Sequence, residues 1–197
     1  MVGKKDFECF WQKNYNGILP LGYILRDYFF DDRWFRIHSL PNSKRYADSE
    51  DEMRIILERQ NGLIDDLLSE KNNYLQLLYH FSETSTSKCF SKIDNVITLD
   101  SIQITNENDD IYLNLAIINK IWENGSIDSY LKAIANDEPI ISNELCEVYH
   151  GLIIDTKKNR IIAPYDGGVD IILNTMQERD DFKLKYKDWL SQHYRGL

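Results

Sequence analysis

The sequence predicts a single α+β domain over residues 1–197, with helices first, a mostly antiparallel sheet after them and a C-terminal helix packed on the sheet. Three observations predict this order. Apolar residues recur at helical spacing near both ends of the chain. Runs rich in β-branched and aromatic residues fill the middle and the stretch before the last helix. No Pro- or Gly-rich linker divides the chain.

Two helices are expected before the first strand. Four aromatic residues share the spacing of one helix face, i, i+3, i+4 and i+8, and these are Phe7, Phe10, Trp11 and Tyr15. Asn16-Gly17 ends this helix, because both residue types favour turns. The apolar stretch LGYILRDYFF after Pro20 predicts a second, shorter helix.

Residues 33–38, RWFRIH, alternate between basic and apolar residues and predict a strand. Phe35 and Ile37 are expected on one of its faces, and Trp34, Arg36 and His38 on the other. The longest helix should follow, from Ser49 to about residue 68. Its first turn has capping-box spacing in Ser49 and Glu52 and an acidic charge that suits the positive end of the helix dipole.

The pattern then changes to strands, which we expect at 74–81, 95–104 and 111–122. A short helix over 126–138 follows and ends before Pro139. Residues 148–173 predict three further strands, the last two joined by a turn at Asp166-Gly167-Gly168, where glycine tolerates a positive φ. Thr175 and Glu178 repeat the capping-box spacing and begin a final helix, which should bury Phe182, Tyr186, Trp189 and Leu190.

The charge of the chain excludes two classes of partner. The 32 acidic and 23 basic side chains give a formal net charge of -9. Nucleic acids and anionic membrane surfaces are bound through basic surfaces, so we expect neither as a partner. No run of about 18 apolar residues is present and the first residues lack an apolar signal region, so the sequence predicts a cytoplasmic protein.

The cysteines point to the same compartment. Cys9, Cys89 and Cys146 are scattered and form no CxxC or Cys/His pattern. An odd, scattered set is typical of buried thiols in a reducing cytosol rather than of a disulfide scaffold or a zinc site. We therefore expect no metal and no cofactor.

A basic cluster is the first candidate binding site. Within 14 residues of an otherwise acidic protein stand Arg33, Arg36, His38, Ser43, Lys44, Arg45 and Tyr46. If these side chains converge, the arginines can hold a carboxylate or a phosphate through paired hydrogen bonds. The competing and favoured interpretation is structural: Arg33 and Arg36 pair with Asp31, Asp32 or the acidic residues of the long helix, and Tyr46 packs under the loop.

The second candidate is the turn with Tyr165, Asp166 and Asp170. Two carboxylates flanking a hairpin turn can do acid/base work or hold a hard cation. A structural role is favoured here too, because Asp before Gly-Gly is a strong hairpin signal and Asp170 can form a local salt bridge. No nucleophile elbow, dinucleotide fingerprint, P-loop or HExxH spacing occurs, which weighs against an enzyme without excluding one.

The chain resembles an uncharacterised family of bacterial cytosolic proteins that share the motifs RWxRxHSLPxSKRY and PYDGGxDxxL. Here the motifs span Arg33–Tyr46 and Pro164–Leu173, with Arg59-Gln60-Asn61 in the helix between them and WLSxH at Trp189–His193. The resemblance covers nearly the whole chain and implies no activity. The C-terminal half is also similar to a domain of unknown function from bacterial toxin-immunity loci, whose corresponding turn carries an arginine where this chain has Gly167.

Two functional hypotheses follow. The favoured one is a non-enzymatic immunity protein that neutralises a cognate bacterial toxin by direct contact, because acidic inhibitors associate rapidly with basic partners. Its contact surface would use exposed acids such as Glu107, Asp109 and Asp110, with tyrosine and tryptophan anchors. The alternative is an enzyme or ligand-binding domain that holds an anionic substrate through Arg36, His38, Lys44 and Arg45, with Asp166 or Asp170 as the acid/base group. It requires Arg36 and His38 to share a pocket with one of these carboxylates.

Overall fold

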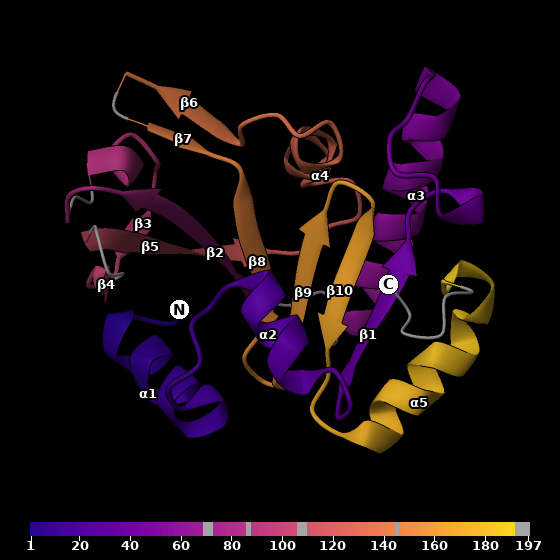
Figure 1. Cartoon of the computed structure of the whole chain (residues 1–197), viewed down its shortest axis with the longest axis horizontal. Coiled ribbons are helices and arrows are strands. Elements are labelled where there is room, and N and C mark those ends of the chain that lie inside the picture. Colours follow the sequence, from indigo (N-terminus) through magenta and orange to yellow (C-terminus); the bar gives the residue numbers. More distant parts are fainter. Residues whose placement is uncertain (69–72, 86–87, 106–109, 145, 192–197) are drawn as a thin grey trace.

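The computed structural model describes residues 1–68, 73–85, 88–105, 110–144 and 146–191. Its centre is an eight-stranded sheet in the order β1-β10-β9-β8-β2-β5-β3, with β4 also paired to β5 (Figure 1). These strands are β1 (Trp34–His38), β2 (Asn73–Ser82), β3 (Val96–Thr98), β4 (Ile102–Thr105), β5 (Asp110–Ile121), β8 (His150–Asp155), β9 (Arg160–Tyr165) and β10 (Gly168–Ile172). All of their pairings are antiparallel. A separate hairpin joins β6 (Ile141–Asn143) to β7 (Cys146–Val148).

Helices cover both faces of this sheet. The helices are α1 (Lys4–Tyr15), α2 (Gly22–Phe29), α3 (Glu50–Leu67), α4 (Asp128–Ala135) and α5 (Met176–Lys185). One core lies between the sheet and α1 and α2, and includes Leu25, Leu77 and Leu152. The other lies between the opposite face and α3, α4 and the end of α5, and includes Leu78 and Ile153. The predicted α+β class, with a C-terminal helix packed on a mostly antiparallel sheet, is confirmed.

Most predicted elements form near their expected bounds, and both helix caps are present. The Ser49 and Thr175 side chains accept hydrogen bonds from the backbone N–H groups of Glu52 (3.3 Å) and Glu178 (3.2 Å). The strand expected at 95–104 is instead two strands, β3 and β4, and the β6–β7 hairpin was not predicted. The last helix ends at Lys185; Tyr186 beyond it is buried, but Phe182, Trp189 and Leu190 are only half-buried.

The order of strands places the first strand beside the last. The chain returns from β8 through β9 to β10, and β10 pairs with β1 in a register that sets Arg36 opposite Asp170 and His38 opposite Gly168. In antiparallel strands, directly opposed side chains on one face are close enough to interact. The pairing therefore brings together a cation and a carboxylate that are 134 residues apart in the sequence.

The turn at Asp166-Gly167 joins β9 to β10 as predicted, but the reason given for its glycines is wrong. Among glycines of the described residues, only Gly17 and Gly125 have positive φ. Gly168 is needed for a different reason, since a Cβ atom there would lie 2.1 Å from the carbonyl oxygen of Ile37. The backbones of β10 and β1 approach each other too closely for any side chain.

The prediction of unpaired cysteines is also wrong. Cys89, in a short 3-10 turn at Lys88–Phe90, forms a disulfide with Cys146 of β7, and their Cα atoms are 5.5 Å apart. The two residues are 57 positions apart in the sequence. Their contact depends on where the β6–β7 hairpin lies, and the spacing of the cysteines does not predict that position. Cys9 is free and exposed. No helix within the described ranges has the length and apolar character needed to cross a bilayer.

Candidate functional site

A groove of about 470 Å³ lies on the α2 side of the sheet and collects five of the ten predicted site residues. Arg36, Arg45, Tyr165, Asp166 and Asp170 line it. The remaining walls come from α2, from β2, β8 and β9, and from the end of α4 and the residues after it. We call this feature the central groove.

Arg36 and Asp170 form a buried ion pair at the base of the central groove. The Arg36 Nε and Nη2 atoms donate hydrogen bonds of 2.8 Å to the two carboxylate oxygens of Asp170. Trp34 Nε1 donates a third hydrogen bond of 3.0 Å to Asp170, and the Tyr165 ring lies 4.3 Å from the Arg36 guanidinium carbon. Burial disfavours the charged guanidinium, but the Asp170 carboxylate outweighs burial and raises the pKa of Arg36. The negative charge of Asp170 therefore cancels the positive charge of Arg36 at the base of the groove.

A second ion pair lies at the rim. Asp166 accepts hydrogen bonds of 2.7 Å from both Arg45 Nε and the Tyr46 hydroxyl. Burial opposes ionisation of Asp166, but these two donors outweigh burial and hold the pKa of the carboxyl below its ordinary value. The Arg45 side chain is 64% exposed, although that of Asp166 is only 12% exposed, so water screens the cation and the pair is weaker than a buried one.

Lys44 and Arg33 lie away from the central groove. Lys44 Nζ contacts Glu52 at 2.6 Å and Asp48 at 2.8 Å, beside the start of α3. Arg33 lies 4.2 Å from the centroid of the Phe29 ring and 3.7 Å from the Asp32 carboxylate. The favoured interpretation, pairing with nearby acids, describes Arg33. The partner of Arg36 is Asp170 rather than an acid of the long helix. Tyr46 is 44% exposed and is not packed under the loop as expected.

His38 and Ser43 line a different cavity, of about 440 Å³, next to Arg59 and Trp189. The His38 ring is buried, and its Nε2 atom has no hydrogen-bond partner among the described residues. Burial, together with the Arg36 cation, lowers the pKa of His38. The alternative hypothesis required Arg36 and His38 to share one pocket with a carboxylate, and the fold separates them.

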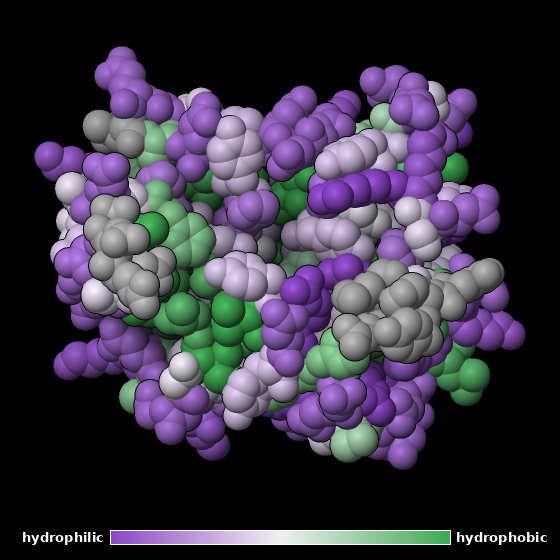
Figure 2. Space-filling view, in the orientation of Figure 1, coloured by the Kyte–Doolittle hydropathy of each residue, from purple (hydrophilic) through white to green (hydrophobic). Residues whose placement is uncertain are grey.

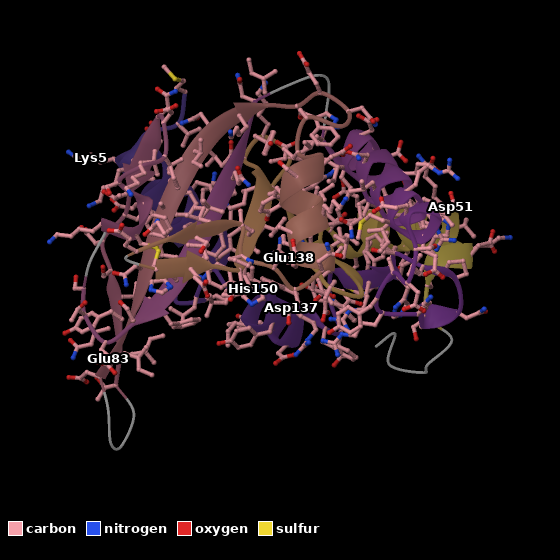
Figure 3. All side chains as sticks on the ribbon, turned by 90° about the horizontal axis from the view of Figure 1, so that it is seen from above. Lys5, Asp51, Glu83, Asp137, Glu138 and His150 are labelled. Atoms are coloured by element: carbon pink, nitrogen blue, oxygen red, sulfur yellow. A yellow bond between two sulfur atoms is a disulfide. The ribbon has the colours of Figure 1, made fainter. Side chains whose placement is uncertain are left out.

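Several groove residues were not found from the sequence. Tyr23 enters from α2, and Tyr79 and Phe81 enter from β2. Tyr149 lies between β7 and β8, and His150 is the first residue of β8. Asp137, just after α4, also lines the groove and lies next to His150 in the side-chain view (Figure 3). The i, i+2 spacing of Tyr79 and Phe81 was an available signal that one strand face carries aromatic residues.

The central groove thus combines exposed aromatic side chains with one carboxylate that has no ion-pair partner. Tyr23 is 48% and Phe81 is 39% exposed. Asp137 is exposed, and no cationic nitrogen of the described residues lies within 4.0 Å of its carboxylate. Partial desolvation lowers the pKa of His150, and the carboxylates of Asp137 and Asp166 oppose that shift. The arrangement suits a partner that brings its own positive charge.

Both lowered histidine pKa values predict a stability that falls in mild acid. The unfolded chain binds protons near the ordinary histidine pKa of 6.5, whereas folded His38 and His150 resist protonation until the pH is lower. The stabilising contribution is therefore complete above 6.5 and is lost as the pH falls below it. Chemical unfolding at a series of pH values should show a shallower acid-side decline for His38→Gln than for the wild type. If the free energy of unfolding fell equally steeply with pH in both proteins, His38 would not be a source of the acid sensitivity.

Comparisons with known proteins give one family and no named relative. No curated protein and no solved structure matches the chain significantly. The family described as a domain of unknown function, DUF3885, matches residues 21–194. This range includes the central groove, from Tyr23 of α2 to Asp170 of β10. The chain therefore belongs to the DUF3885 family of domains of unknown function.

Proposed function

We propose that this protein is a non-enzymatic binding protein that neutralises a toxin by direct contact, as an immunity protein, and that its partner presents a basic surface to the central groove. The observation that carries the proposal is the internal neutralisation of the basic segment. Arg36, Lys44 and Arg45 each contact a carboxylate of the same chain. An anionic ligand would have to displace these carboxylates, whereas a cationic partner would not.

The surface outside these ion pairs supports the same class of partner. The net charge is -9, and the face in Figure 2 is mostly hydrophilic, with apolar residues visible between α1 and α2. Exposed tyrosine and phenylalanine side chains beside a carboxylate are the usual anchors of a protein interface. Of the acids that the sequence suggested as contacts, Asp110 is exposed, and Glu107 and Asp109 lie outside the described residues.

The alternative, an enzyme or ligand-binding domain for an anionic substrate, has one supporting observation. Arg36, Arg45, Asp166 and Asp170 do line the same groove, and the buried Tyr165 hydroxyl there has no partner among the described residues. Two members of the proposed clamp are missing from that groove, because Lys44 contacts Glu52 and His38 lines the second cavity. We therefore rank this function second.

Co-expression with a toxin, if one is encoded beside this protein, tests the proposal. The wild type should restore growth and co-purify with the toxin, and the association rate should fall as salt is added, because screening weakens the attraction of opposite charges. Normal toxicity in the presence of the folded protein, without a complex, would overturn the proposal.

Two tyrosines of α2 form a matched pair for locating the contact surface. Tyr23 lines the central groove, whereas Tyr28 is 66% exposed and lies outside it. Tyr23→Ala should weaken binding by about 30-fold, the effect of losing an interfacial aromatic anchor, and Tyr28→Ala should change it little. Equal effects of both substitutions, measured by calorimetry on the purified complex, would show that the central groove is not the contact surface.

A further inference from the structure

A cluster of metal-ligating side chains lies on the face of the sheet opposite the central groove. His80 of β2, Cys89 and Cys146 of β7 each offer a ligand atom, and these atoms all lie within 4.8 Å of one another. The three residues come from three separate segments of the chain. Imidazole nitrogen and thiolate sulfur are the ligands that Zn²⁺ takes most often in proteins.

The imidazole of His80 is held in a form that suits a metal ligand. Its Nδ1 atom lies 3.1 Å from the backbone carbonyl oxygen of Glu147. A carbonyl oxygen only accepts hydrogen bonds, so Nδ1 is the donor in this contact, and the neutral ring would offer Nε2 to a metal. A backbone carbonyl that receives the second ring N–H is the usual outer partner of a metal-bound histidine, because it fixes both tautomer and ring orientation.

The two cysteine segments are also held together independently of the sulfur atoms. The Asn143 side-chain amide donates a hydrogen bond of 3.3 Å to the carbonyl oxygen of Cys89, and its oxygen accepts one of 3.3 Å from the Cys146 N–H. Cys89 is buried at 2% exposure, while Cys146 and His80 are half-buried. Asn143 therefore joins the two segments through contacts that do not depend on the disulfide, and the half-buried side of the cluster is accessible to a small ion.

We propose that the reduced protein binds one Zn²⁺ ion through Cys89, Cys146 and His80, with a fourth position open to water. In the oxidised protein the two sulfurs are joined to each other. A dithiol reductant supplies two electrons and two protons, which break the S–S bond and leave two thiols, and the reductant becomes a disulfide. Zn²⁺ then binds as the two thiols release two protons. The two cysteine segments are thus joined either by the disulfide or by the metal ion, but not by both at once.

The backbone of this site continues directly into the wall of the central groove. Val148 ends β7, and the next two residues are Tyr149 and His150, which line the groove. Phe81, another groove residue, follows His80 directly on β2. Neighbouring residues on a strand point to opposite faces, so the link behind the sheet holds the same backbone that presents these side chains in front.

Co²⁺ is the probe that tests the site, because its tetrahedral thiolate complexes absorb visible light and show a sulfur-to-cobalt charge-transfer band. The full chain is reduced with a phosphine, which leaves no competing thiol, and titrated with Co²⁺ without oxygen. One equivalent should produce both absorptions, and Zn²⁺ should abolish them. The oxidised protein should produce neither. Absence of the charge-transfer band in the reduced, folded wild type would overturn the proposal.

Variants then assign the ligands, each with a matched control. Cys89→Ser and Cys146→Ser should each lose most of the charge-transfer band, and Cys9→Ser should keep it. His80→Gln should keep both thiolates but bind Co²⁺ at least 10-fold more weakly, since changing even an outer partner of a ligand costs 10- to 100-fold. His150→Gln should bind like the wild type. Unchanged binding by His80→Gln, shown to be folded by circular dichroism, would remove His80 from the site and overturn the three-ligand proposal.

Discussion

Replacing Arg36 by methionine is expected to lower the free energy of unfolding by about 3–5 kcal/mol, the usual cost of breaking a buried ion pair from one side. The Asp170 side chain is only 7% exposed, so its charge would stay buried. It would keep one hydrogen bond, from Trp34, in place of three. Denaturant unfolding followed by tryptophan fluorescence measures the loss.

Two controls separate the buried charge from the loss of packing. The double variant Arg36→Met/Asp170→Leu should recover much of the stability, because it removes both charges and keeps apolar volume. Arg45→Met breaks a pair whose cation is 64% exposed and should cost less than about 1 kcal/mol. A loss at Arg36 no larger than the loss at Arg45 would show that the Arg36–Asp170 pair contributes no more than a surface pair.

Gly168→Ala should destabilise the protein by about 3 kcal/mol or more, at the upper end of the cost of overpacking a core. The added Cβ would lie 2.1 Å from the Ile37 carbonyl oxygen, which belongs to the backbone of β1. Relief of the clash requires β1 and β10 to separate, and this opens the ion pair formed across them. Thermal unfolding measures the effect.

Gly62 of α3 is the matched control, because a Cβ there meets nothing within 4 Å. Gly62→Ala should stabilise the protein by about 0.5–1 kcal/mol, the advantage of alanine over glycine inside a helix. If both substitutions changed the stability in the same direction, the close approach of the two strands would not be the reason for Gly168.

Local patterns were enough to predict most elements of this fold, although not the β6–β7 hairpin or the division between β3 and β4. The cap at Ser49 depends on a residue three positions away, and the faces of β1 follow from alternation alone, with Phe35 and Ile37 in one core and Trp34 in the other. Such features are decided within a few residues of chain. They are therefore visible in a single sequence.

The candidate site depends on strand pairing, which leaves no local signature. Arg36 meets Asp170 across 134 positions, and Cys89 meets Cys146 across 57. His38 is the reverse case. Only Ile37 separates it from Arg36 in the sequence, and yet the two side chains line different cavities. The basic residues are adjacent in the sequence but lie in separate places in the structure. Arg36 and Arg45 line the central groove, whereas His38 lines the second cavity.

The pairing of β1 with β10 also affects how the protein is made. During synthesis β1 leaves the ribosome more than a hundred residues before its partner strand. Until then Phe35 and Ile37 have no neighbouring strand beside them, and apolar edges of this kind are prone to wrong pairing. Closing such a long loop costs entropy before any contact rewards it, so the β10-facing edge of β1 stays unpaired until the last hairpin of the chain has been made.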